Sequence, residues 1–146
     1  MARKVFFSFK YEDVSRAMVV RNSNVIKSDE KAGFIDKADF EAVKKQGDQA
    51  IKNWIDNQLK GTTVTVVLVG AKTNLSKWVK YEIDQSIKQG NGLLGINISM
   101  IKDLNGNTTT CCATMPKGYS FYKWIAYNGY LKLGEWVEAA AKAAGK

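Results

Sequence analysis

The apolar run Val64–Gly70 constrains the fold of this chain more than any other segment. Its sequence, VTVVLVG, does not alternate between polar and apolar residues, which is typical of a strand buried on both faces of a parallel sheet. An amphipathic helix is predicted soon after it, over Ser76–Gly90. A buried strand followed by a helix is the unit from which parallel sheets with helices on both faces are built.

Short runs rich in aromatic and β-branched residues predict further strands around this unit. They are Lys4–Phe9, Gly92–Ile98, an edge strand at Phe121–Tyr127, and either NVIK at 24–27 or GFID at 33–36. Helical periods predict helices over Tyr11–Asn22, Asp39–Leu59, with Gly47 as a weak point, and Gly129–Ala144. This order predicts an α/β, flavodoxin-like three-layer fold with a central, mostly parallel five-stranded sheet.

The helix predicted over Ser76–Gly90 carries two informative faces. Val79, Ile83 and Ile87 repeat every four residues, so we expect them to face the core. Trp78 and Glu82 are also four residues apart, and both project from a neighbouring face. A carboxylate one turn beyond a tryptophan would therefore lie just past the end of a buried strand, where open α/β sheets bind their ligands.

The size and composition of the chain favour a single domain, 1–146. The segment 99–122 shows no clear period and is predicted to be an insertion or a long loop. No apolar run is long enough to span a bilayer, so no membrane contact is predicted. The apolar stretch near the N-terminus is too short for a signal peptide, and we expect a cytoplasmic protein.

The absence of histidine restricts the chemistry of the chain. Ser–His and Cys–His nucleophile systems are excluded, and the commonest metal ligand is missing. The adjacent cysteines Cys111 and Cys112 do not make a zinc site on their own, so no metal site and no cofactor are predicted. Catalysis would rely on carboxylates, hydroxyls, lysine, tyrosine or cysteine.

The formal net charge of +8 comes from lysines scattered along the chain. A hydrated, soluble surface is the simplest interpretation, and attraction for a polyanionic ligand such as a dinucleotide is the alternative. No basic, aromatic-rich stripe is present, which argues against nucleic-acid binding. The residues that phospho-acceptor receivers and flavin sites require after the predicted strands are also absent, as is a G-x-G-x-x-G fingerprint.

The candidate site lies at the carboxyl ends of the first and central strands. The turn Ser8–Tyr11 leads into a helix N-terminus, which can hold a phosphate through backbone N–H groups. Lys10 adds positive charge, and Phe9 or Tyr11 could stack on a base or a pyridine ring. Glu82 would face a ligand lying in the crevice between the two strands.

A single carboxylate in this place fits cleavage of the nicotinamide–ribose bond of NAD. Nicotinamide leaves the pyridinium as a neutral molecule, so its departure needs no general acid. The developing ribosyl oxocarbenium needs a nearby negative charge, which Glu82 can supply. By spacing alone, a hydrated helix residue paired with a lysine is the commoner role for such a glutamate, and packing is the commoner role for Trp78.

These residues together resemble the TIR domain, and more narrowly the TIR-like proteins of the bacterial Thoeris anti-phage defence system. WVKYEI after a hydrophobic strand, combined with FFSF in the first strand, is the most specific part of the resemblance. The segments that carry it are Val5–Val14, Val19–Ile26, Thr62–Gly70, Trp78–Ile87, Gly92–Ile98 and Trp124–Val137.

The resemblance implies a flavodoxin-like sheet and NAD as substrate. The catalytic glutamate of the W-V-x-x-E-I pattern maps onto Glu82, with Trp78 as its partner, and the pocket wall after the first strand maps onto Phe7, Ser8 and Phe9. The Arg-Asp-x-x-Pro-Gly loop of animal adaptor TIR domains is absent, because the stretch 28–40 has no proline. The second wall of the pocket is therefore unassigned, and Asp36 is a candidate contributor to it.

The resemblance also implies a role in signalling. A phage-derived trigger of unknown identity would switch on synthesis of a cyclic ADP-ribose isomer or a related ADP-ribosyl nucleotide, and this diffusible signal would activate a separate effector protein. Homo-oligomerisation is left open. The alternative is a non-catalytic TIR-like module that senses a phage component or assembles with partners.

Overall fold

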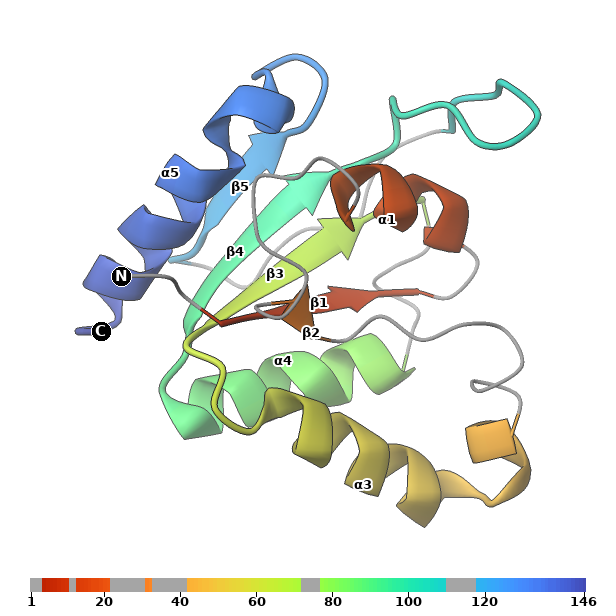
Figure 1. The fold of residues 1–146 in the computed structure, drawn as a ribbon, viewed down its shortest axis with the longest axis vertical. Coiled ribbons are helices and arrows are strands. Elements are labelled where there is room, and N and C mark those ends of the chain that lie inside the picture. Colours follow the sequence, from red (N-terminus) through yellow and green to blue (C-terminus); the bar gives the residue numbers. More distant parts are fainter. Residues whose placement is uncertain (1–3, 11–12, 22–30, 33–41, 72–76, 110–117) are drawn as a thin grey trace.

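The computed structural model describes residues 4–10, 13–21, 31–32, 42–71, 77–109 and 118–146. Its strands form one sheet in the order β2–β1–β3–β4–β5, and every neighbouring pair is parallel (Figure 1). The strands are β1 (Val5–Phe9), β2 (Lys31–Ala32), β3 (Val64–Val69), β4 (Gly92–Asn97) and β5 (Ser120–Lys123). The predicted parallel five-stranded sheet is therefore confirmed, although β2 is only two residues long.

Within the described residues, helices cover both faces of this sheet (Figure 1). They are α1 (Val14–Arg21), α3 (Asp48–Leu59), α4 (Lys77–Gln89) and α5 (Gly129–Ala143). Residues of α1 and α5 join an apolar cluster on one face, and residues of α3 and α4 pack against the other. The chain thus has the three-layer, flavodoxin-like architecture that the element order predicts. Within the described ranges, no helix is long and apolar enough to cross a membrane.

Several predicted boundaries are wrong, and each error has a local cause. The helix predicted over Asp39–Leu59 breaks at Gly47, whose φ of 93° is outside the helical region, so α3 begins at Asp48. Strand β2 lies between the two segments proposed for it, and both of those lie outside the described residues. Strand β5 ends at Lys123 because the chain turns over residues 124–128 before α5.

The first predicted helix is also shorter than expected. It was predicted from Tyr11, but α1 begins at Val14. Asp13 therefore precedes the helix, and it is buried. Tyr11 lies outside the described residues.

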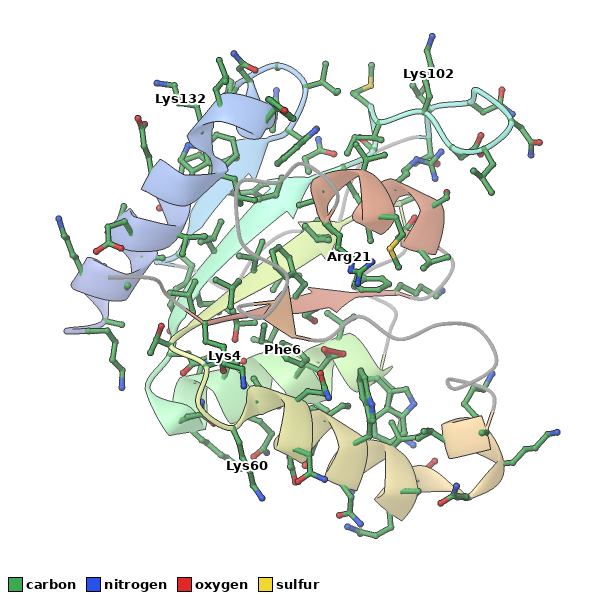
Figure 2. All side chains as sticks on the ribbon, viewed as in Figure 1. Lys4, Phe6, Arg21, Lys60, Lys102 and Lys132 are labelled. Carbon is green, nitrogen blue, oxygen red and sulfur yellow. The ribbon has the colours of Figure 1, made fainter. Side chains whose placement is uncertain are left out.

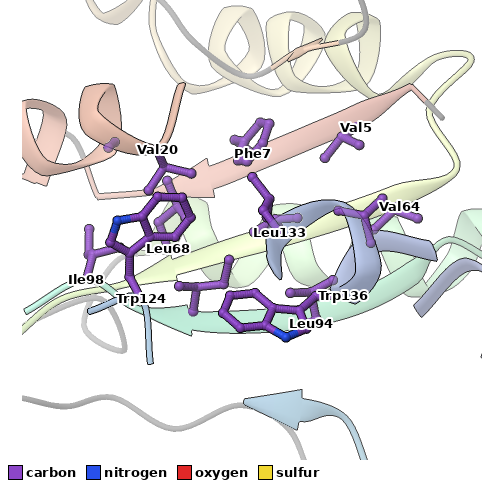
Figure 3. Close-up of a cluster of buried hydrophobic side chains, with 14 of the residues drawn as sticks. Val5, Phe7, Val20, Val64, Leu68, Leu94, Ile98, Trp124, Leu133 and Trp136 are labelled. Atoms are coloured by element: carbon purple, nitrogen blue, oxygen red, sulfur yellow. The ribbon is translucent and has the colours of Figure 1, made fainter. Parts of the chain in front are cut away.

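The core between the sheet and the helices α1 and α5 is apolar. Val5 and Phe7 of β1, Leu68 of β3 and Leu94 of β4 point into it, and Leu133 of α5 fills its centre (Figure 3). All five of these side chains are almost fully buried. Large buried apolar side chains of this kind supply most of the free energy of folding.

The face covered by α3 and α4 is built differently. Its apolar residues form two smaller clusters, one around Phe6 and α3 and one around Val67, Val69 and Val79. Phe6 lies on the side of β1 that faces these helices (Figure 2). Polar side chains of β1, β3 and α4 are also buried on this face, and they include Ser8 and Thr65.

The orientation of α4 differs from the prediction. Val79 is buried and Ile83 packs partly against the apolar cluster, but Ile87 is 44% exposed. The buried side of the helix consists of Val79, Glu82 and Ser86. The helix is thus rotated so that two polar side chains face the sheet, where hydroxyl groups of the strands meet them.

Candidate active site

Glu82 lies under the sheet on the inner side of α4. Only 7% of the residue is exposed, so it is not a hydrated surface glutamate. Burial raises the pKa of its carboxyl well above the ordinary value of 4.5, because the charged form loses its hydration. A carboxylate that is costly to ionise in the free protein is typical of functional sites.

Ser8 of β1 lies close to this carboxyl. Its hydroxyl is fully buried and partly offsets the rise in the pKa of Glu82. The two groups nevertheless do not reach ordinary hydrogen-bond geometry, and Ser8 Oγ has no hydrogen-bond partner among the described residues. A buried hydroxyl without a hydrogen-bond partner among the described residues thus lies close to a buried acid.

Trp78 lies one turn before Glu82 and packs between α4 and α3. It joins the cluster around Phe6 and Ile55, and its ring meets Tyr81 edge-on with the centroids 6.1 Å apart. The ammonium of Lys77 lies 4.7 Å from the centroid of the Trp78 ring. These contacts are packing contacts, and a role for Trp78 in ligand binding stays a prediction.

Phe7 and Phe9 lie on the other side of β1 from Ser8, because side chains alternate along a strand. Phe7 is buried in the core beneath α1 and α5, and Phe9 packs against the same cluster. The structure therefore brings Ser8 to Glu82 but places Phe7 on the opposite face of the sheet. Lys10 is partly buried in the turn after β1, where its carbonyl accepts the backbone N–H of Asp13 at 2.8 Å. Asp36, like Tyr11, lies outside the described residues.

Sequence reasoning missed a buried ion pair at the carboxyl edge of the sheet. Asp13 and Arg16, 8% and 7% exposed, lie three residues apart with 3.8 Å between Oδ1 and Nη1. The carboxyl of Asp13 also lies directly against Gly70 at the end of β3, because a Cβ at Gly70 would come within 2.4 Å of Asp13 Oδ2. The turn after β1 and the end of β3, which border the predicted crevice, are therefore in contact.

The same arginine holds the loop that follows β4. Arg16 donates from Nε to the carbonyl of Ile101 at 2.8 Å and from Nη2 to the carbonyl of Asn107 at 2.9 Å. Its Nη2 also lies 3.7 Å from the carboxylate of Asp103. Hydrogen bonds from the backbone N–H groups of Asn107 and Asn105, together with Arg16, lower the pKa of Asp103, although burial opposes them. The three-residue spacing of Asp13 and Arg16 could have predicted their ion pair. The hydrogen bonds from Arg16 to backbone carbonyls could not be predicted, because a backbone carbonyl is present at every residue.

A cavity of about 370 Å³ lies near the amino ends of β4 and β5, between these strands and the helices α4 and α5. Asn91, Gly92, Tyr119, Tyr122 and Trp136 are among the residues that line it. None of the predicted site residues lines this cavity, so it has no part in the candidate active site.

The strand order, together with a buried glutamate on the helix that follows the central strand, fits a TIR-like domain. Comparison with known families agrees, since residues 6–103 match the family described as "Thoeris protein ThsB, TIR-like domain". This chain belongs to that family, which confirms the resemblance seen in the sequence. Both Glu82 and Ser8 lie within the matched range.

One curated relative is similar over nearly the whole chain. It is the protein named "Putative cyclic ADP-D-ribose synthase ThsB1" from Bacillus cereus (strain MSX-D12). The two are 42% identical over 140 residues, which is 94% of this chain and 72% of the relative. The similarity extends beyond the residues that the family comparison matches.

Proposed function

We propose that this chain is an anti-phage defence enzyme that cleaves the nicotinamide–ribose bond of NAD and converts the ADP-ribosyl part into a cyclic ADP-ribose-type signal. Membership of the Thoeris ThsB family and the name of the Bacillus cereus relative support this function. The observation that carries it is the burial of Glu82 beside Ser8, on the helix that follows the central strand.

One carboxylate is enough for this reaction. As the bond to nicotinamide breaks, the ring leaves as a neutral molecule and positive charge develops on the ribose. Glu82 stabilises that charge, and its dry surroundings strengthen the attraction because nearby water does not screen it. The leaving group needs no proton from a general acid, which suits a chain without histidine.

The raised pKa of Glu82 links catalysis to substrate binding. In the free protein the protonated carboxyl is favoured by burial. The pyridinium ring of NAD carries a positive charge, and its arrival beside Glu82 favours the ionised form. We therefore expect kcat/KM for NAD to rise with pH through a midpoint above the ordinary carboxyl value of 4.5.

The fate of the ADP-ribosyl part depends on what attacks the ribose. If water is excluded from the closed site, a nucleophile within the bound molecule reacts and a cyclic product forms, whereas admitted water gives ADP-ribose. We propose that the product diffuses to a separate effector protein, and that a phage-derived trigger starts its synthesis. NAD is the substrate in this scheme.

The test compares the nucleotide pools of phage-infected cells that carry the wild type, Glu82→Gln or Glu135→Gln. Glu135 is the matched control, since its side chain is 71% exposed. We expect nicotinamide and an ADP-ribosyl nucleotide to appear in the mass spectrum with the wild type and Glu135→Gln, and not with Glu82→Gln. Unchanged product with Glu82→Gln would overturn the assignment of Glu82. Protection of Glu82→Gln cells without any product would instead indicate a non-catalytic sensor.

A further inference from the structure

A chain of hydrogen-bonded side chains connects α4 to the sheet directly behind Glu82. Thr65 of β3 and Ser86 of α4 are both fully buried, and their hydroxyl oxygens lie 2.7 Å apart. Ser86 Oγ also lies 2.7 Å from the backbone carbonyl oxygen of Glu82, one turn earlier in the helix. Two hydroxyl groups therefore tie the turn that carries Glu82 to the central strand.

The direction of each hydrogen bond in this chain follows from the groups involved. A carbonyl oxygen only accepts hydrogen bonds, so Ser86 donates its single hydroxyl hydrogen to the backbone carbonyl of Glu82. Thr65 must then donate to Ser86, and the side-chain amide of Asn91 donates to Thr65 at 3.3 Å. The hydrogen bonds thus run from Asn91 to Thr65, from Thr65 to Ser86 and from Ser86 to the carbonyl of Glu82, and in this arrangement the hydroxyl hydrogens of Thr65 and Ser86 both have an acceptor.

The far end of the chain is anchored as well. Asn91 Nδ2 donates to Thr62 Oγ1 at 3.0 Å, and the Thr62 hydroxyl donates to the carbonyl of Leu59 at 2.6 Å. Gln89 Nε2 donates to Asn91 Oδ1 at 3.1 Å. The polar groups of the chain are therefore satisfied, which gives a rigid connection in a buried place.

Glu82 needs such an anchor because burial of its carboxyl group costs free energy, which favours movement of the helix toward solvent. A buried carboxylate regains hydration if its helix slides or rotates toward solvent, so that displacement lowers its free energy. Apolar contacts lack direction and oppose a small slide only weakly, whereas a buried hydrogen bond fixes both distance and direction. The hydroxyl of Thr65 therefore holds in place a turn that would otherwise relax outward.

We propose that Thr65 and Ser86 are positioning residues for the reaction, which hold the backbone of Glu82 against β3 so that its carboxyl stays beside Ser8. This inference rests on the proposed role of Glu82 in cleaving NAD. Neither hydroxyl touches the substrate, and both act through Glu82. The geometry requires a hydroxyl at each position rather than a side chain of a particular size.

The test separates the hydroxyl from the shape of the side chain. Thr65→Val keeps the shape and removes the hydroxyl, whereas Thr65→Ser keeps the hydroxyl. Nicotinamide release from NAD is measured with purified protein and an extract of phage-infected cells, with the extract alone subtracted. We expect Thr65→Val to lower kcat roughly 10- to 100-fold with little change in KM, because a small misplacement of a catalytic group slows the chemical step. Thr65→Ser should restore most of the rate.

Thr62→Val is the matched control, since it removes a hydroxyl from the same chain two hydrogen bonds beyond Thr65 and four from Glu82. It should reduce stability but keep kcat near the wild-type value. If Thr65→Val does not fold, Ser86→Ala makes the same test, because it removes the donor to Glu82 itself. An equal loss of kcat in Thr62→Val and Thr65→Val, or no rescue by Thr65→Ser, would show a purely structural role and overturn the inference.

A second readout does not need turnover. The carboxyl carbon of Glu82 is followed by ¹³C NMR as the pH changes in wild type, Thr65→Val and Thr62→Val. We expect the titration midpoint to move toward 4.5 in Thr65→Val alone, because the carboxyl moves toward water. An unchanged midpoint together with an unchanged kcat would refute the positioning role. Full turnover by Glu82→Gln would refute the proposed function, while a shifted midpoint in Thr65→Val would still establish the anchor.

Discussion

The two faces of the sheet are built on different principles. The face under α1 and α5 is an apolar core in which Phe7, Leu94 and Leu133 are almost fully buried. The face under α3 and α4 buries a glutamate and several hydroxyl groups between two smaller apolar clusters. Apolar burial on the first face stabilises the folded chain. Burial of Glu82 on the second face costs free energy, and the stability from the first face offsets that cost.

This contrast explains how one small sheet can be both stable and reactive. Burying an ionisable group without a counter-ion costs free energy, and that cost is tolerable only where packing elsewhere offsets it. Strand β3 contributes to both faces. Val64 and Val66 face the apolar core, whereas Thr65 between them faces α4. Substitutions on the two faces should therefore have separable effects on stability and activity.

The largest loss of stability should come from the apolar face. Leu94→Ala removes a fully buried side chain at the centre of that core and should lower the free energy of unfolding by about 2–5 kcal/mol. Urea denaturation measures this change, and Leu131→Ala, at a position that is 66% exposed, is the matched control. NAD cleavage per folded molecule should stay the same. Equal stability of the two variants would contradict the importance of this core.

A smaller effect is expected where α5 packs closely against β4. A Cβ at Gly92 would lie 2.4 Å from the carbonyl oxygen of Ala140, so Gly92→Ala forces the helix away from the sheet. The free energy of unfolding should fall by about 1–3 kcal/mol, which thermal denaturation detects. If Gly92→Ala is as stable as the wild type, the close approach of α5 is not needed for packing.

On the polar face, a substitution should raise the free energy of unfolding relative to the wild type instead of lowering it. The pKa of Glu82 is raised in the folded protein, so folding favours the protonated form. Below the unfolded value near 4.5, Glu82→Gln and the wild type should be about equally stable. As the pH rises through the folded pKa, the wild type loses stability and the variant does not, by about 1.4 kcal/mol for each unit of the shift.

Thermal denaturation of Glu82→Gln and the wild type over a series of pH values from about 4 upward measures that difference. Glu135→Gln should track the wild type at every pH, because its side chain is exposed. A difference between Glu82→Gln and the wild type that shrinks as the pH rises would show that the carboxyl is stabilised in its charged form.

The smallest effect should appear on the outer side of α3 and α4. Lys77 Nζ lies 2.6 Å from Asp48 Oδ2, but the two side chains are 64% and 65% exposed. Lys77→Ala should change the free energy of unfolding by less than about 1 kcal/mol, and salt should reduce even that difference. A larger change that salt does not reduce would point instead to the contact between Lys77 and the Trp78 ring.

The sequence predicts the apolar face well and the polar face only in part. An unbroken apolar run such as Val64–Val69 predicts burial on both faces without knowledge of the neighbouring elements, and the structure buries all six of its residues. The rotation of α4 was predicted from Ile87, which is exposed, because a repeat of apolar residues carries no information about polar partners on the sheet. The hydroxyl groups that favour burial of Glu82 and Ser86 belong to strands distant in sequence.

The candidate site shows the same limit. The position of Glu82 after the central strand followed from the element order, and Ser8 followed from the resemblance to TIR domains. Of the predicted pocket wall, Ser8 faces Glu82 while Phe7 lies on the opposite face of the sheet, because consecutive residues of a strand point to alternate faces. The contacts of Arg16 were missed since their acceptors are backbone carbonyls.

The central claim is that the buried carboxyl of Glu82 drives the loss of nicotinamide from NAD. The most direct measurement is the rate of nicotinamide release by purified wild type, Glu82→Gln and Glu135→Gln in the presence of an extract of phage-infected cells. Glu82→Gln should be slower than the wild type by roughly 100-fold or more, with Glu135→Gln unchanged. Wild-type release by a folded Glu82→Gln protein would contradict the claim.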